Sequence, residues 1–156
     1  MTYEEMQAQY NEEVTTIETD LSGVSGLKGL YFDGCIAIDQ NISTSVEKSC
    51  IYAEELGHHY TSVGNILEQT SVENRKQELK ARIWGYNLKI GLNGIINAYK
   101  HGCRNRYEIA EYLDVTEKYL TEALSAYASI YGLYTQFDNY IVYFNNGGVA
   151  VFEWME

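Results

Sequence analysis

The stretch Ala53-Glu54-Glu55-Leu56-Gly57-His58-His59 holds two of the three histidines in the chain and most strongly indicates its fold. Ala53 and the three residues before it, Cys50, Ile51 and Tyr52, are apolar, which favours a partly buried α-helix. On such a helix, side chains four positions apart lie on the same face. Glu54 and His58 are therefore expected to point the same way, and Glu55 and His59 form a second pair of this kind.

This spacing is the one that zinc peptidases use in the motif H-E-x-x-H, where two histidines bind the ion and the glutamate is the general base. In this chain Glu54 stands at the first ligand position, Glu55 at the base position and His58 at the second ligand position. Because a carboxylate oxygen can also bind zinc, a metal site that includes Glu54 is chemically allowed. Three other interpretations stay open. They are a solvated surface pair, Glu55 and His59 as the ligands, and a fold that binds a partner without catalysis.

The neighbouring sequence supplies further candidates. Gly57 interrupts the helix at a cost of about 1 kcal/mol relative to alanine, so we expect another backbone or a ligand to approach it closely. A second helix, predicted over about residues 71–88, carries the carboxylate of Glu78 on one face. Cys50 precedes Glu54 by one helical turn. We expect it to be a small buried residue rather than a metal ligand.

Outward from this stretch, the pattern predicts an α+β fold with strands first, helices in the middle and a hairpin at the end. Asp33-Gly34 joins two apolar runs and predicts a hairpin. The expected elements are a helix over 3–12, a strand over 14–18, the hairpin over 29–39, helices over about 41–60 and 71–88, one or two short helices between glycines 91 and 102, a helix–turn–helix over about 105–130, and a hairpin centred on 145–148.

Charge and composition exclude several classes of protein. The chain has 156 residues, with 11 lysines and arginines against 22 acidic residues, which gives a formal charge of −11. Such acidity disfavours direct binding to nucleic acid or to an anionic membrane. No apolar run is long enough for a membrane span, and the acidic start lacks the features of a signal peptide. We therefore expect one cytoplasmic domain over residues 1–156 with reduced cysteines.

The segment Glu54–Tyr60 resembles the active-site helix of the ImmA/IrrE family of metallo-endopeptidases. The hairpin over 29–39 resembles the one that precedes this helix in the family, and Glu78-x-x-Ala81-x-x-Trp84-Gly85 resembles the segment that supplies its third metal ligand. The resemblance extends from about residue 10 to the C-terminal hairpin and includes a helix–turn–helix. Its second helix, over about 116–124, has no arginine and an acidic face, so we expect a packing element rather than a DNA reader.

The resemblance implies a zincin-like metallopeptidase core that binds zinc and cleaves a helix–turn–helix transcriptional repressor of a phage, mobile element or stress gene. It implies that His58 and Glu78 are metal ligands, that Glu55 is the general base, and that Glu54 replaces the family's first histidine. The alternative is a catalytically inactive member that regulates by binding a protein. Two carboxylates would make the ion a weaker Lewis acid, and oxygen ligands suit Mn²⁺ or Fe²⁺ better than two histidines do.

Overall fold

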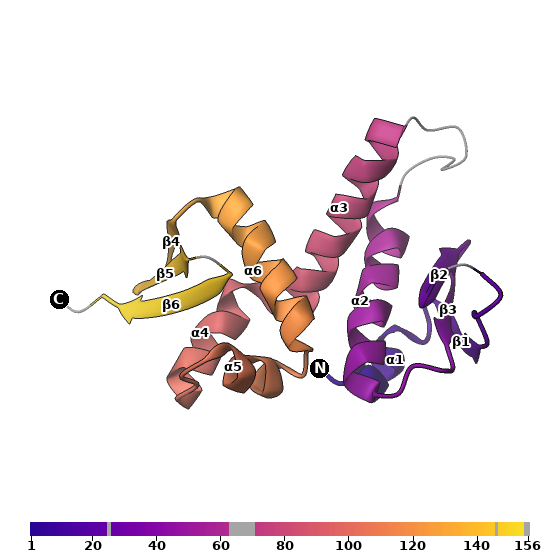
Figure 1. Cartoon of the computed structure of the whole chain (residues 1–156), viewed down its shortest axis with the longest axis horizontal. Helices are drawn as coiled ribbons and strands as arrows, with labels where there is room; N and C mark the ends of the chain where they lie inside the picture. Colours follow the sequence, from indigo (N-terminus) through magenta and orange to yellow (C-terminus); the bar gives the residue numbers. More distant parts are fainter. Residues whose placement is uncertain (25, 63–70, 146, 155–156) are drawn as a thin grey trace. The chain divides into compact units, whose positions relative to one another are not determined.

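A computed structural model of the chain describes residues 1–24, 26–62, 71–145 and 147–154. It is an α+β protein, as predicted (Figure 1). The chain forms two compact units, Met1–Leu88 and Lys89–Glu156, and each is described by itself. The prediction of a single domain, like that of a zincin-like core, stays a prediction.

The first unit combines a small sheet with three helices. Its elements are α1 (Tyr3–Tyr10), β1 (Thr15–Thr19), β2 (Gly29–Phe32), β3 (Cys35–Asp39), α2 (Ser45–Thr61) and α3 (Ser71–Lys89, whose last residue belongs to the second unit). The strand order is β1-β3-β2, with β1 parallel and β2 antiparallel to β3. Strand β2 therefore lies at one edge of this sheet, a position that matters for the site.

The predicted hairpin at Asp33-Gly34 is confirmed. Phe32 pairs with Cys35 across a two-residue turn, and Asp33 and Gly34 have φ angles of 46° and 77°. Two consecutive positive φ angles characterise the turn whose twist matches that of paired strands, and glycine or aspartate adopts them at low cost. The sequence thereby brings β2 back along β3 and toward α2.

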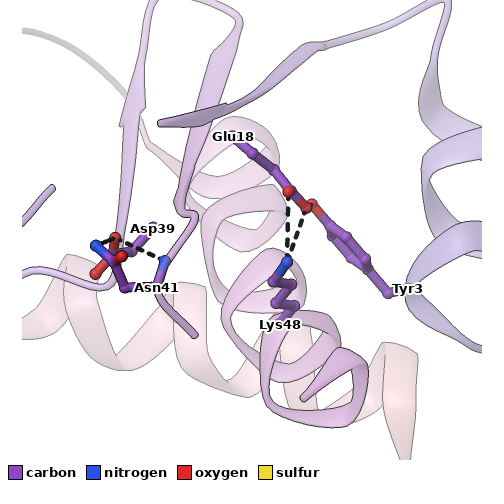
Figure 2. A network of polar contacts seen from close by, with 5 residues as sticks. All are labelled: Tyr3, Glu18, Asp39, Asn41 and Lys48. Carbon is purple, nitrogen blue, oxygen red and sulfur yellow. Dashed lines mark hydrogen bonds and ion pairs between the residues drawn. The ribbon is translucent and has the colours of Figure 1, made fainter. Parts of the chain in front are cut away.

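Apolar side chains from α1, the sheet and α2 form the core of the first unit. Ile36, Ile38, Tyr52 and Leu56 are fully buried, and Trp84 of α3 packs against this cluster. Polar contacts at the edge of the core connect the same elements (Figure 2). The hydroxyl of Tyr3 donates to Oε1 of Glu18 over 2.9 Å, and Nζ of Lys48 lies 3.3 Å from the same oxygen. These contacts fix α1, β1 and α2 relative to one another.

Helices α2 and α3 touch through their backbones. A Cβ atom added at Gly57 would overlap the carbonyl oxygen of Ala81, and Ala81 itself is completely buried. The prediction that another backbone approaches Gly57 is therefore confirmed. Only glycine permits this distance, because any side chain at position 57 would push the two helices apart.

The second unit packs three helices against another sheet, in which all neighbouring strands are antiparallel. Its elements are α4 (Gly91–His101), α5 (Arg106–Leu113), α6 (Glu117–Tyr131), β4 (Tyr134–Phe137), β5 (Tyr140–Asn145) and β6 (Gly148–Glu153). The strand order is β4-β5-β6. Helices α5 and α6 form the predicted helix–turn–helix, with Asp114 in the left-handed conformation at the turn and Thr116 capping α6.

Among the described residues, the predicted helices and strands agree with the structure except for one strand that was not predicted. The sequence pattern did not assign β4, which adds a third strand to the C-terminal hairpin. The sequence also predicts a break in the helical pattern over 61–65, which lies partly outside the described residues. In the turn of the hairpin centred on 145–148, only Asn146 is not described, and Asn145 pairs with Gly148. No helix in the described part of the chain combines the length and apolar character needed to cross a bilayer.

Candidate metal centre

The candidate site is built on the C-terminal half of α2. Thr44 caps the start of this helix, and its hydroxyl accepts a hydrogen bond from the backbone N–H of Glu47. One face of the helix is buried against the core through Tyr52, Ala53 and Leu56. Because Leu56 is anchored in this way, the neighbouring polar side chains take fixed directions around the helix.

Three predicted ligands lie together. One donor atom from each of Glu54, His58 and Glu78 lies within 4.8 Å of the other two, so that the three residues form a group that could hold a metal ion. The first two come from successive turns of α2, as their spacing predicts, and Glu78 comes from α3. The contact between Gly57 and Ala81 brings His58 and Glu78 close together, because Gly57 adjoins His58 and Ala81 follows Glu78 by three residues.

The separation of His58 and Glu78 is compatible with a small divalent cation. Nε2 of His58 lies 3.4 Å from Oε1 of Glu78. Two ligands bound at about 2.1 Å to a tetrahedral ion are about 3.4 Å apart, so this pair already has the separation that such an ion requires. Imidazole nitrogen and carboxylate oxygen are also ligand types that Zn²⁺, Mn²⁺ and Fe²⁺ accept.

The charges of His58 and Glu78 stabilise each other. The hydrogen bond to Glu78 raises the pKa of His58 above its ordinary value, despite the opposing effect of burial. The same hydrogen bond lowers the pKa of Glu78. In the metal-free protein this pair therefore favours an imidazolium next to a carboxylate, and a cation that binds there has to displace the proton of His58.

Glu55 occupies a different environment. It is only 8% exposed, and its carboxyl group lies against the backbone of β2, where a Cβ atom added at Gly29 would be 3.1 Å from Oε1 of Glu55. Burial raises the pKa of Glu55 to about 7, although the nearby imidazole of His58 opposes the shift. A carboxyl group with a pKa near neutrality can both accept and release a proton, as a general base and acid must do.

His59 does not join the group. Its Nδ1 lies 2.7 Å from the hydroxyl of Tyr31 in β2, and that hydroxyl also accepts a hydrogen bond from the backbone N–H of Gly34. Glu55 and His59 thus both face β2, and neither belongs to the candidate metal group of Glu54, His58 and Glu78. The alternative of Glu55 and His59 as ligands therefore lacks a third donor among the described residues.

Arg82 is a neighbour of the site to which the sequence alone assigned no role. Its Nε lies 3.5 Å from Oε1 of Glu54, and it follows Glu78 by one helical turn. The signal was present in the sequence, since positions 78 and 82 share a helix face, but the partner on α2 depends on how the helices pack. Cys50 is buried and lies outside the candidate metal group.

A separate hollow of about 350 Å³ lies within the second unit, lined mainly by residues of α4, β6 and the segment 103–106. Its lining includes Arg104 and Arg106 but no acidic or histidine side chain. It therefore lacks the carboxylate and imidazole groups that the candidate metal group provides.

Comparison with known proteins identifies no relative. No family model matches the chain, and no curated protein and no solved structure matches it.

Proposed function

We propose that this protein is a metal-dependent endopeptidase that cleaves a helix–turn–helix transcriptional repressor and so relieves repression. The observation that carries the peptidase part of the proposal is the group of Glu54, His58 and Glu78 next to the buried Glu55. The choice of a repressor as substrate rests on the resemblance to the ImmA/IrrE family.

The proposed ligands are Glu54, His58 and Glu78, with Zn²⁺ as the first candidate and Mn²⁺ or Fe²⁺ as alternatives. A bound ion of this kind polarises a peptide carbonyl and increases the acidity of water. Glu55 is the proposed general base. Because its carboxyl group has a pKa of about 7, it is suited to take a proton from the attacking water and to deliver it to the leaving amine.

The edge position of β2 supports a peptide as the substrate. Among the described residues, β2 pairs with β3 on one side only, so its other edge offers backbone groups to an extended chain. Leu30 and Phe32 on this strand are 43% and 76% exposed. Since Gly29 of the same strand touches Glu55, a peptide along β2 would lie close to the proposed base.

Purified protein loaded with Zn²⁺ or Mn²⁺ tests the proposal, with a peptide mixture and an intact helix–turn–helix repressor as substrates and mass spectrometry as the readout. We expect cleavage by the native chain, loss of cleavage with a chelator, and recovery when metal returns. Glu55→Gln should lower the rate by about 100-fold or more while it retains the metal. Lys80→Gln, on the exposed surface of α3, is the matched control.

If metal binds but no peptide or repressor is cut, the enzyme proposal fails. Tight binding of an uncut repressor by both the native chain and Glu55→Gln would then support the non-catalytic regulator.

A further inference from the structure

The guanidinium of Arg82 lies beside the carboxylate of Glu54. Its Nε is 3.5 Å from Oε1 of Glu54. Arg82 and Glu78 are four residues apart on α3, so they share a helix face. Arg82 thus pairs with an acidic group of α2 and lies on the same face of α3 as a second acidic group.

The charge of the ligand set explains why such a cation is useful. Two histidines and one glutamate bring one negative charge to a divalent ion, whereas Glu54, His58 and Glu78 bring two. A second carboxylate makes the ion a weaker electrophile. The arginine returns the net charge of the ligands and their neighbour to minus one, because it stays protonated at any physiological pH.

We propose that Arg82 is the counter-cation of this metal centre: it orients Glu54 and offsets one of the two carboxylate charges around the ion. The inference rests on the proposed function, because it assumes that the three residues bind a metal. Arg82 is a positioning residue here and touches neither the substrate nor the reacting atoms. The pair of Glu54 and Arg82 together takes the place of a neutral ligand.

Arg82 should weaken the binding of divalent cations, since it competes with them for Glu54 and repels them. Its side chain is about half exposed, and solvent screens its charge. We therefore expect removal of this charge to tighten metal binding by about tenfold.

The test titrates the metal-free full chain with Zn²⁺ against a chromophoric chelator, and separately with Mn²⁺. Arg82→Gln should lower both dissociation constants by about tenfold, and Arg82→Lys, which keeps the charge, should stay within about threefold of the native value. Lys80→Gln changes the net charge equally on the same helix and should have no effect. Equal affinities for the native chain and Arg82→Gln, or equal effects of Arg82→Gln and Lys80→Gln, would overturn the proposal.

A double-mutant cycle tests whether Arg82 acts through Glu54. In a Glu54→Gln background the carboxylate partner is gone, so Arg82→Gln should tighten metal binding by about threefold or less. The same tenfold effect in both backgrounds would show that the guanidinium acts only as a distant charge, which contradicts the pairing. If the native chain binds neither metal, the proposed function itself fails, and that result is distinct from equal binding by the native chain and Arg82→Gln.

Discussion

The backbone of Gly57 in α2 lies directly against the carbonyl group of Ala81 in α3, with no space for a side chain between them. This contact fixes the register of the two helices at one point. His58 follows the contact on α2 by one residue, and Glu78 precedes it on α3 by three. The approach of the two backbones is therefore what brings a carboxylate of one helix to the imidazole of the other.

Gly57→Ala should separate the helices. The added methyl group overlaps backbone rather than a flexible side chain, so we expect a loss of about 1–3 kcal/mol in the free energy of unfolding. Zinc affinity should fall by about tenfold or more, since Glu78 moves away from His58. Urea denaturation and zinc titration measure the two effects.

Gly23→Ala is the control for that substitution, because a Cβ atom at position 23 meets nothing within 4 Å. It should leave the free energy of unfolding within about 0.5 kcal/mol of the native value. A Gly57→Ala variant that is as stable as this control and binds zinc normally would refute the role of the contact.

The metal-free protein should lose stability as the pH rises from about 5 to 8. Burial raises the pKa of Glu55 in the folded chain from 4.5 to about 7, so the folded chain holds this proton more tightly than the unfolded chain does. The resulting contribution to the free energy of unfolding is fully present below pH 4.5 and is lost as the pH rises through 7. The shift corresponds to about 3 kcal/mol. The raised pKa of His58 acts in the same direction at higher pH, whereas the lowered pKa of Glu78 removes stability only as the pH falls through the acid range.

Urea denaturation of chelator-treated protein at pH 5.5 and pH 8 measures this dependence. Glu55→Gln cannot ionise at position 55, so it should show a clearly smaller decrease and be more stable than the native chain at pH 8. Equal decreases in the two proteins would mean that Glu55 is not the group responsible.

Tyr31→Phe should destabilise the first unit without disturbing the metal group. Its hydroxyl accepts from the backbone N–H of Gly34 and shares a hydrogen bond with Nδ1 of His59, and the loss of both costs about 1–2 kcal/mol. Zinc affinity should change by less than about threefold, because His59 lies outside the group. Tyr134→Phe, at a residue that is 59% exposed, is the control. A large loss of zinc affinity in Tyr31→Phe would instead place His59 in the coordination sphere.

Added zinc should stabilise the native chain but not His58→Ala. A ligand at 100 times its dissociation constant raises the free energy of unfolding by about 2.7 kcal/mol when it binds only the folded state. Thermal or urea denaturation with and without zinc measures this difference. Stabilisation of the same size in both proteins would locate the zinc elsewhere.

The sequence predicts local structure well and distant contacts only in part. The Asp33-Gly34 turn and the shared face of Glu54 and His58 follow from short-range rules of turn and helix geometry. The helix pattern offered Glu78 as a candidate carboxylate, but only the resemblance to a family implied that it joins them from 20 residues away, because spacing says nothing about which helices meet. Strand β4 could have been found, since Tyr134–Phe137 is rich in residues that favour strands and precedes an Asp-Asn turn.

The partners of Glu54 and His59 were not predictable in the same way. Arg82 reaches Glu54 only because α2 and α3 cross at Gly57, and Tyr31 reaches His59 only because the edge strand lies over α2. Both pairs depend on tertiary packing, for which a single sequence carries no periodic signal.

The three candidate ligands come from only two helices, and this affects how long the protein would persist in the cell. An ion shared by α2 and α3 would act as a crosslink beside the stacked rings of Tyr60 and Trp84, which join the same helices. When the ion is scarce, this helix pair would open more often and present its aromatic residues to degrading proteases. The amount of the protein would then follow the supply of metal, even if the rate of its synthesis stayed constant.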